Sequence, residues 1–466
     1  MWYMKYYMVL FVDMYKNLFY YYMYTIISLI IHRGDMSMSE KTKVVLLGAG
    51  DRGTIYANYI KDHRDEVEIV AVAEPIKERR ENIQKMFNLK DEYVFLSWEQ
   101  ALNIGKIGDV VIVSTQDRMH YEPTMKSLEL GYHVLLEKPM SPDLKECIDM
   151  VNKAEEKKLH LLVCHVLRYT EFFKELKKIL DNKEIGELIT IQHIENVGYY
   201  HQAHSFVRGN WRNKEESAPM ILAKCCHDLD LMYWYANSDC ESLASYGSTK
   251  HFKAECAPEG AAKRCLDCGI KDCPYDARKI YFKCIQDTAT QDANTTSTRH
   301  WPASTITEDL SREGITKALK EGPYGRCVYH CDNNVVDNQV ISLNFKNGVT
   351  VAFTMTAFTA KVSRITRFMG THGEVRANTE TNKIEIYNFK DDSVRVIDVK
   401  EPDSGHGGGD SGIMRDFLDL VKTDKVEERY TTGRVSIASH VMALLAEESR
   451  LKKESINIEE AIKNLL

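Results

Sequence analysis

A glycine-rich turn between Lys43 and Gly53 constrains the fold of this chain more than any other stretch. An apolar, β-branched run ends at Gly48, and Gly48, Gly50 and Gly53 then form a G-x-G-x-x-G ahead of a segment with a helical pattern. A strand, a glycine turn and a helix are the context that the dinucleotide-binding fingerprint requires. The three glycines allow a tight turn, a close approach of the backbone to a diphosphate, and close packing of helix on strand. The pattern predicts a nucleotide-binding domain, and a tight loop without a ligand is the alternative.

An acidic residue follows this turn at the distance that the fingerprint leads one to expect. Glu74 ends the predicted strand 67–73 and lies 21 residues after Gly53. A carboxylate at this place accepts hydrogen bonds from an adenine-ribose diol, which favours NAD. Arg79 and Arg80 follow closely, so NADP stays an open alternative.

Composition excludes several classes of protein. The chain has 466 residues, enough for two domains, and its 44% hydrophobic and 28% charged residues are typical of a soluble globular protein. The formal charge of −7 comes without a sustained basic stripe, which argues against nucleic acid as a partner. Twelve cysteines occur without an N-terminal signal peptide. A reduced, cytoplasmic chain is therefore expected, with clustered cysteines as metal ligands rather than disulfides.

The first 37 residues are unlike the rest. Residues 1–32 are crowded with Tyr, Met, Leu and Ile, but the only clean apolar run is 18–31. This run is short for a membrane span, which needs ~20 residues. Met36 and Met38 precede a polar lead into the first predicted strand. We interpret residues 1–37 as a leader that is not native, with a membrane anchor as the alternative; otherwise no membrane association is expected.

Strands and helices alternate through residues 42–165, the first predicted domain. β-rich segments are predicted at 67–73, 93–96, 109–114, 132–136 and 161–164, and helices at 54–63, 77–87 and 143–158. This alternation predicts an α/β Rossmann domain with a doubly wound parallel sheet. Ligands bind such sheets at the carboxyl ends of the strands, where Thr115, His120 and Lys138 fall.

Residues 166–466 form the second predicted domain, which is rich in strands. Predicted strands lie at 188–195, 340–345, 349–356, 365–369, 374–377, 383–387 and 393–399, and predicted helices at 224–235, 411–422 and 434–452. Many strands with few helices between them predict an α+β domain with a large, mostly antiparallel open sheet. A cysteine-rich insertion is expected at about 237–330.

Several motifs together carry a family resemblance that no one of them carries alone. The chain resembles the Gfo/Idh/MocA oxidoreductases, such as glucose-fructose oxidoreductase and inositol dehydrogenase. The resemblance rests on Gly48-x-Gly50-x-Arg52-Gly53, Ser114-Thr115-x-x-x-x-His120, Gly131-Tyr-His-Val134, Glu137-Lys138-Pro139, Arg168-Tyr169, Glu184-Ile185-Gly186-Glu187-Leu188 and His227-Asp228-x-Asp230.

This resemblance implies an NAD(P)-dependent enzyme that acts on a small carbohydrate substrate. It also implies a homodimer or homotetramer formed through the sheet of the second domain. The implied cofactor-binding residues are Gly48, Gly50, Asp51, Arg52, Gly53, Glu74, Ser114, Thr115, His120, Glu137 and Lys138.

Lys138 is the first candidate for catalysis. Hydride transfer from a carbinol requires the hydroxyl proton to leave with a base, or to return from an acid in the reverse direction. A partly desolvated lysine near a charged cofactor suits this task, and Pro139 fixes the backbone after it. A surface lysine in a turn is the alternative reading.

His227 and Lys224 are the other catalytic candidates, and they share one face of a predicted helix. A histidine is suited to proton transfer or to holding a sugar hydroxyl, whereas a core histidine bonded to a carbonyl is the alternative. The chain departs from the family here, because Ala223 replaces the acid that usually precedes this histidine by four residues. An intact Lys-Asp-His relay therefore cannot be carried over.

Aromatic and basic side chains gather ahead of this motif. Such side chains suit a carbohydrate, and pairs of basic groups suit a carboxylate or phosphate. The cluster is Tyr199, Tyr200, His201, His204, Arg208, Trp211 and Arg212, and the substrate candidates are Arg168, Tyr200, His204, Trp211, Arg212, Asp228 and His406. His406 stands in a glycine-rich loop, Gly405–Asp410, which could bring His406 or Asp410 over the site. Capping of the following helix by Asp410 is the alternative.

Four cysteines in the insertion have a spacing typical of metal ligands. The four are Cys256, Cys265, Cys268 and Cys273, and the spacing from Cys265 to Cys268 is a C-x2-C core. A tetrahedral zinc site would fold a loop that lacks a hydrophobic core. An iron–sulfur cluster and scattered free thiols are the alternatives.

The sequence therefore predicts an oxidoreductase that transfers a hydride between NAD(P) and a sugar, polyol or sugar derivative. Lys138 and His227 would handle the hydroxyl proton. Two alternatives remain open. One is a redox-neutral, NAD-dependent glycosidase of the same fold, and the other is a nucleotide-binding regulator without catalysis.

Overall fold

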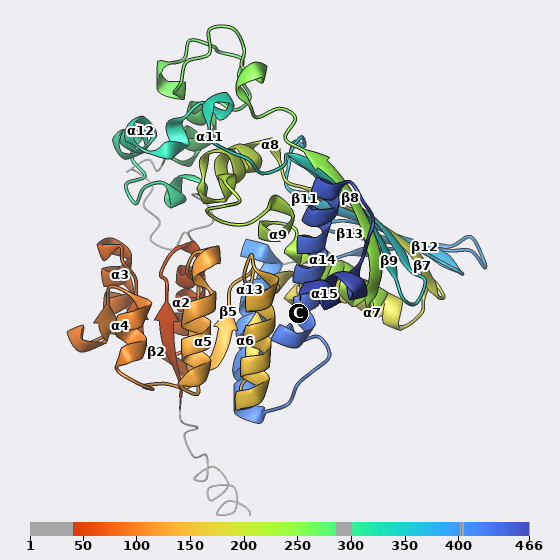
Figure 1. Ribbon diagram of the computed structural model, residues 1–466, viewed down its shortest axis with the longest axis horizontal. Helices are drawn as coiled ribbons and strands as arrows, with labels where there is room; N and C mark the ends of the chain where they lie inside the picture. The colour runs from red at the N-terminus through yellow and green to blue at the C-terminus, as the bar shows by residue number, and fades with distance from the viewer. Residues whose placement is uncertain (1–40, 286–300, 401, 403–404, 466) are drawn as a thin grey trace, which may run out of the picture.

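The computed structural model describes residues 41–285, 301–400, 402 and 405–465, so the predicted leader lies outside the described residues. The chain forms two domains, with helices α8, α11 and α12 above the first of them in the view of Figure 1. No helix within these ranges has the length and apolar composition needed to cross a membrane.

The first domain is built on a six-stranded, entirely parallel sheet, as predicted. Its strand order is β3-β2-β1-β4-β5-β6. The strands are β1 (Thr42–Leu47), β2 (Val67–Ala73), β3 (Val94–Phe95), β4 (Val110–Val113), β5 (His133–Leu136) and β6 (Leu161–Val163). The helices are α2 (Asp51–Asp62), α3 (Lys77–Phe87), α4 (Trp98–Asn103), α5 (Tyr121–Glu129) and α6 (Leu144–Lys157).

Both faces of this sheet are covered, which explains the unbroken apolar strands. Alternate residues of a strand point to opposite faces. Val45 and Leu47 therefore belong to one core cluster, with residues of α4, α5 and α6. Val44 and Leu46 belong to another, which includes residues of α2, α3 and α13 (Gly409–Thr423). Helix α13 thus returns from the end of the chain to cover the first domain.

The second domain contains a nine-stranded sheet of order β14-β13-β12-β11-β7-β10-β9-β8-β15. Strands β7 and β10 pair in parallel, and all other neighbouring strands of this sheet pair antiparallel. The predicted mostly antiparallel sheet is therefore confirmed. Its strands are β7 (Leu188–Asn196), β8 (Cys240–Ser248), β9 (Asn338–Phe345), β10 (Thr350–Thr356), β11 (Ser363–Gly370), β12 (Gly373–Asn378), β13 (Lys383–Asn388), β14 (Val394–Asp398) and β15 (Ile456–Asn457).

Helices α10, α14 and α15 pack against this sheet. In Figure 1, α14 and α15 lie over β8 and β9. The helices of the second half of the chain, besides α13, are α7 (Glu171–Asp181), α8 (Tyr199–His201), α9 (Met220–Ala223), α10 (Cys226–Ala236), α11 (Ala277–Tyr281), α12 (Arg312–Glu321), α14 (Gly433–Lys452) and α15 (Ile458–Leu465). A π-helical segment, Gln202–Arg208, follows α8.

The structure divides the predicted insertion between a strand of the large sheet and residues outside that sheet. The expected insertion at about 237–330 includes strand β8, whose polar and small residues (Cys-Glu-Ser-Leu-Ala-Ser-Tyr-Gly-Ser) give a weak strand signal. Between β8 and β9, the described residues 249–285 and 301–337 lie outside the sheet. They have a hydrophobic cluster of their own that includes Phe252, Tyr281 and Ile315.

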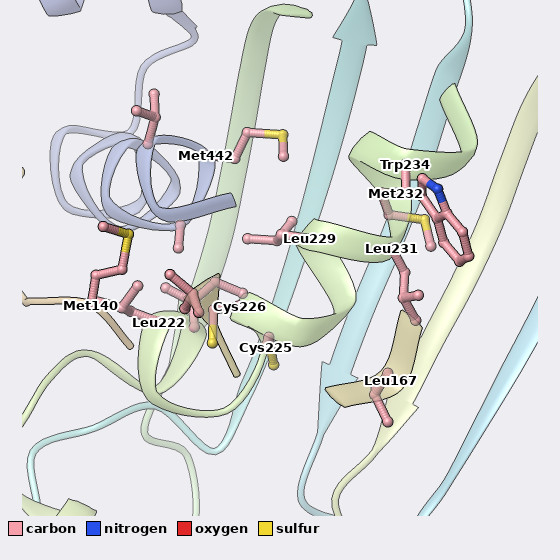
Figure 2. Packing of buried hydrophobic residues seen from close by; sticks show 14 of the residues in the cluster. Met140, Leu167, Leu222, Cys225, Cys226, Leu229, Leu231, Met232, Trp234 and Met442 are labelled. Atoms are coloured by element: carbon pink, nitrogen blue, oxygen red, sulfur yellow. The ribbon is translucent and has the colours of Figure 1, made fainter. Parts of the chain in front are cut away.

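One core cluster continues from the first domain into the second. Met140, just after β5, belongs to the same cluster as Leu222 of α9 and Met442 of α14. Figure 2 shows Met140 beside Leu222, with Cys226 close by. This shared core fixes the first domain against the helices that carry the second set of candidate residues.

Candidate active site

The glycine turn has the geometry that a dinucleotide requires. Gly48 has a φ of +90°. A Cβ on Gly53 would lie 2.1 Å from the carbonyl oxygen of Gly48, so no larger residue fits there. Helix α2 begins at Asp51 without a side-chain cap. Its first amides and its positive end therefore face the turn, where a diphosphate would lie.

Replacing Gly53 by alanine is expected to raise the Kd for NAD at least about tenfold, because the new methyl group would push the turn away from the helix that it packs on. Titration calorimetry with NAD measures this directly. Gly269→Ala is the matched control, since a Cβ there meets nothing within 4 Å. Equal affinity of Gly53→Ala and the wild type would contradict the assignment of the turn.

Glu74 is held at the end of β2 by two backbone amides. Its Oε2 accepts from Ala49 N at 2.7 Å, and its Oε1 accepts from Ile76 N at 2.9 Å. The carboxylate therefore also fixes the turn. Of the two following arginines, Arg80 donates a hydrogen bond to the carbonyl of Glu74. Arg79 lies beside Gly50: a Cβ added to Gly50 would be 3.6 Å from Nη1 of Arg79.

Arg52 is the centre of a network that joins distant parts of the chain. Its guanidinium pairs with Glu137 and with Asp410 at 2.6 Å each and donates to Tyr56 Oη at 2.6 Å. Burial alone would raise the pKa of Glu137, but Arg52 and Lys138 lower it overall, so the carboxylate stays ionised. Asp410 lies at the start of α13, and its side chain does not cap that helix. Its contact with Arg52 could not be read from the sequence, because only the fold brings α13 to Arg52.

Lys138 follows β5 and reaches the second domain. Its backbone amide donates to Glu137 Oε2 at 3.0 Å, and its Nζ donates to the carbonyl oxygen of Ala223 at 3.0 Å. The residue that replaces the family's usual acid thus still contacts the lysine, through its main chain. The peptide bond between Lys138 and Pro139 is cis.

His227 lies in the first turn of α10 and is 7% exposed. Its Nδ1 is buried and has no hydrogen-bond partner among the described residues. Burial, Lys138 and His165 hold the pKa of His227 well below its usual value. The lowered pKa favours a neutral imidazole, and its Nδ1 is enclosed by the protein.

A buried charge network supports Lys224 and Asp228. Lys224 Nζ lies 3.2 Å from Glu195 Oε1. Arg364 Nε donates to Asp228 Oδ1 at 2.7 Å, and the nearby His193 Nε2 lies 2.9 Å from the same oxygen. Asp228 is 0% exposed, so its role is to hold neighbours rather than to contact substrate. Sequence reasoning missed Glu195, His193 and Arg364, which come from strands β7 and β11.

The residues after β4 are bound to the main chain. Ser114 Oγ donates to the carbonyl of Gly48 at 2.8 Å, and Thr115 Oγ1 donates to that of Met119 at 3.0 Å. His120 is 1% exposed, and its Nδ1 lies 2.7 Å from the carbonyl oxygen of Pro139. Ser114 thus ties the segment after β4 to the glycine turn, and His120 ties it to Pro139.

The structure disperses several substrate candidates. Arg168 is 1% exposed and pairs with Asp230 at 2.6 Å, which gives it a structural role. His204 lies in the core of the insertion, 2.7 Å from Tyr281 Oη. Trp211 donates a hydrogen bond to Asp117, and Arg212 pairs with Asp332. The ring centroid of Tyr200 lies 6.1 Å from that of Trp301.

His406 approaches the site from the glycine-rich loop. Its ring centroid lies 6.4 Å from that of His227, and its Nδ1 lies 3.1 Å from Asp410 Oδ2. His406 has a φ of +53°, and Gly407 and Gly408 also have positive φ values. Glycines therefore let the loop turn toward Arg52.

The metal prediction is wrong for the described part of the chain. Within it, no group of three or more His, Cys, Asp or Glu side chains could hold a metal ion. Cys256, Cys265, Cys268 and Cys273 are free thiols, as are the other described cysteines. The premise of the prediction also fails, because the insertion has a hydrophobic cluster of its own and needs no metal to supply one.

The first domain has the parallel sheet of a nucleotide-binding domain, and the second domain brings Ala223 and His227 to Lys138. This combination is typical of two-domain, nucleotide-dependent oxidoreductases. The chain belongs to the Gfo/Idh/MocA oxidoreductase family. The family profile for the NAD-binding Rossmann fold matches residues 42–165, and the profile for the C-terminal alpha/beta domain matches residues 177–458.

Named relatives are distant. YteT of Bacillus subtilis, named as an oxidoreductase, is 22% identical over 69% of this chain and 74% of its own length. The scyllo-inositol 2-dehydrogenase (NADP(+)) IolW of the same organism is 31% identical over 39% of this chain. The matched region spans 48% of IolW, about half of that protein.

Solved structures share the fold at low identity. The WlbA dehydrogenase of Bordetella pertussis, in complex with NADH and UDP-GlcNAcA, is 17% identical with a TM-score of 0.61 and covers 90% of this chain and 99% of its own. An inositol dehydrogenase, myo-inositol 2-dehydrogenase of Lactobacillus plantarum, is 16% identical with a TM-score of 0.60 over the same shares.

Proposed function

We propose that the protein is an NAD-dependent oxidoreductase that transfers a hydride between nicotinamide and a hydroxyl-bearing carbon of a sugar, polyol or sugar derivative. The observation that carries the proposal is the contact of Lys138 Nζ with Ala223 of the second domain, four residues before His227. This contact brings an amine and a neutral imidazole together at the carboxyl end of β5, where ligands of such sheets bind.

The chemistry then divides between two side chains. In the oxidative direction the substrate O–H bond breaks and its proton passes to the Lys138 amine, while the C–H bond gives up its hydrogen with the electron pair and the carbonyl forms. Bound NAD supplies the hydride acceptor. The neutral His227, which is 7% exposed and close enough to Lys138 to feel its charge, holds the reacting hydroxyl. Arg52 and Glu137 fix the backbone from which Lys138 extends.

The residues of the glycine turn fit NAD. Glu74 remains a carboxylate acceptor for the ribose diol, and the turn leaves no room for a Cβ at Gly48 or at Gly53. Arg79, beside Gly50, is the group that would favour NADP instead.

The position of His406 supports a second candidate, the redox-neutral glycosidase. The imidazole of His406, which lies near that of His227, could protonate a leaving group after transient oxidation of the sugar. The protein should be tested with NAD or NADP and a panel of sugars, inositols and glycosides, following reduced nicotinamide together with release of the aglycone. Net reduction identifies the oxidoreductase, and release without net reduction identifies the glycosidase. Silence in both channels favours the regulator.

We also propose that a second copy of the chain covers the outer face of the large sheet. Five residues in register form a row across five strands: Tyr246, Val340, Thr354, Ile194 and Ile365. Tyr246, Val340 and Ile365 are 61%, 46% and 37% exposed. An apolar row of this kind is typical of a surface that binds a partner.

Replacing Val340 by glutamate is expected to dissociate the oligomer, because a charge would be buried in an apolar interface. Light scattering coupled to size exclusion measures the mass. Leu451→Glu, at an exposed residue near the end of α14, is the control. A wild-type protein that is already a monomer would contradict the proposal.

A further inference from the structure

One peptide unit next to Lys138 is held by two histidines that are far apart in the sequence. The carbonyl oxygen of Pro139 accepts a hydrogen bond from His120 Nδ1 at 2.7 Å. The N–H of Met140 donates to His440 Nε2 at 2.8 Å. Both polar groups of this peptide therefore have an imidazole partner. All three side chains that surround it, His120, Met140 and His440, are at most 1% exposed.

The environment of His440 fixes which of its nitrogens accepts. His440 Nδ1 lies 2.9 Å from the carbonyl oxygen of Ser436, one turn earlier in α14, and a carbonyl can only accept. Nδ1 therefore carries the proton, and Nε2 presents its lone pair to Met140. Burial and the neighbouring His165 lower the pKa of His440 to about 3, so the ring stays neutral over the pH range in which the protein would work.

The opposite side of Lys138 is fixed as well. Its own amide donates to Glu137 Oε2, and Glu137 is in turn bound by Arg52 and Tyr56. With the peptide before Lys138 and the Pro139–Met140 peptide both held, the direction of the Lys138 side chain is set. That direction takes Nζ across to the carbonyl of Ala223.

We infer that His120 and His440 are positioning residues for Lys138, which clamp the Pro139–Met140 peptide and so aim the lysine at the site between the domains. This inference rests on the proposed function. A buried peptide that loses one partner is expected to rotate toward another, because an unpaired buried N–H or C=O is costly. A displacement of the lysine by an ångström would be enough to slow the reaction by about 10²-fold.

The test compares a variant that keeps the hydrogen bond with one that removes it. In His440→Gln a side-chain oxygen can reach the place of Nε2, whereas His440→Leu has no acceptor. For His120, asparagine keeps a donor near Nδ1 and leucine does not. Because the substrate is unidentified, the first readout is the rate at which acetic anhydride labels Lys138, measured by mass spectrometry of the digested protein.

We expect Lys138 to be labelled several times faster in His440→Leu than in the wild type and in His440→Gln, with Lys224 and the surface lysines unchanged. NAD affinity should be the same in all three proteins, and kcat should fall in the leucine variant alone if a substrate is found. If His440→Leu does not fold, the His120→Asn and His120→Leu pair gives the same comparison of Lys138 labelling, without the NAD-affinity readout, because His120 is itself a candidate for cofactor binding.

Two results would overturn the inference. One is identical labelling of Lys138 in the wild type and in both leucine variants. The other is a general rise in labelling of all lysines, which would show that the histidines only stabilise the fold. Selective labelling in a protein that oxidises no substrate would uphold the clamp and count against the proposed reaction instead.

Discussion

Replacing Lys138 by methionine is expected to lower kcat by about 10²–10⁴-fold, which is the range contributed by a positioned acid or base. Methionine keeps a side chain of similar length but cannot take or give a proton. The only hydrogen bond lost from the Lys138 amine, among those that the structure describes, is the one to the Ala223 carbonyl. The protein should therefore fold and bind NAD. Steady-state rates and NAD titration measure the two properties separately.

Lys145→Met is the control for this experiment. Lys145 lies in the first turn of α6 with its side chain 75% exposed, and it pairs only with Asp149. Its replacement should leave kcat unchanged. A Lys138→Met protein with wild-type kcat would remove Lys138 from the reaction.

Replacing Arg168 by methionine is expected to lower the free energy of unfolding by about 3–5 kcal/mol, because it leaves the carboxylate of Asp230 buried without its cation. Arg168 and Asp230 are each 1% exposed, and the guanidinium also lies over the ring of Trp234. Burial raises the pKa of Asp230 even with Arg168 present. Denaturant unfolding measures the loss.

Arg434→Met is the matched control, because Arg434 also forms a two-bond pair, with Glu155, but at 61% and 52% side-chain exposure. An exposed pair contributes at most about 1 kcal/mol. The double variant Arg168→Met with Asp230→Leu should recover part of the lost stability. Equal effects of Arg168→Met and Arg434→Met would contradict the structural role given to Arg168.

Much of the fold could be predicted because local pattern and burial agree. The apolar runs of β1 and β4 lie between two layers of helices, so every residue of them meets a core. Strand β8 could not be predicted in this way, since it is largely polar and depends on pairing with β9. The position of α13 on the first domain also depends on contacts far apart in the sequence.

The residues of the candidate site also fall into two groups: those that local spacing predicts and those that only the fold brings together. The glycine turn, Glu74 and Lys138 follow from local spacing, and the structure places them at the expected edge of the sheet. The contacts of Asp410 and His440 could not be found by spacing, because these residues reach the site from α13 and α14, 358 residues after Arg52 and 300 residues after Met140. The cysteine spacing predicted a metal, but it carried no information about the hydrophobic cluster of the insertion.

The most direct test of the central claim follows a labelled hydrogen. The protein, loaded with NAD, would be incubated with sugars, inositols and glycosides that carry deuterium on carbon, quenched, and the cofactor weighed by mass spectrometry. The proposed function predicts reduced cofactor one mass unit heavier than ordinary NADH with at least one substrate class, formed about 10²–10⁴-fold more slowly by Lys138→Met. Cofactor that stays oxidised and unlabelled with every substrate would contradict hydride transfer as the activity of this protein.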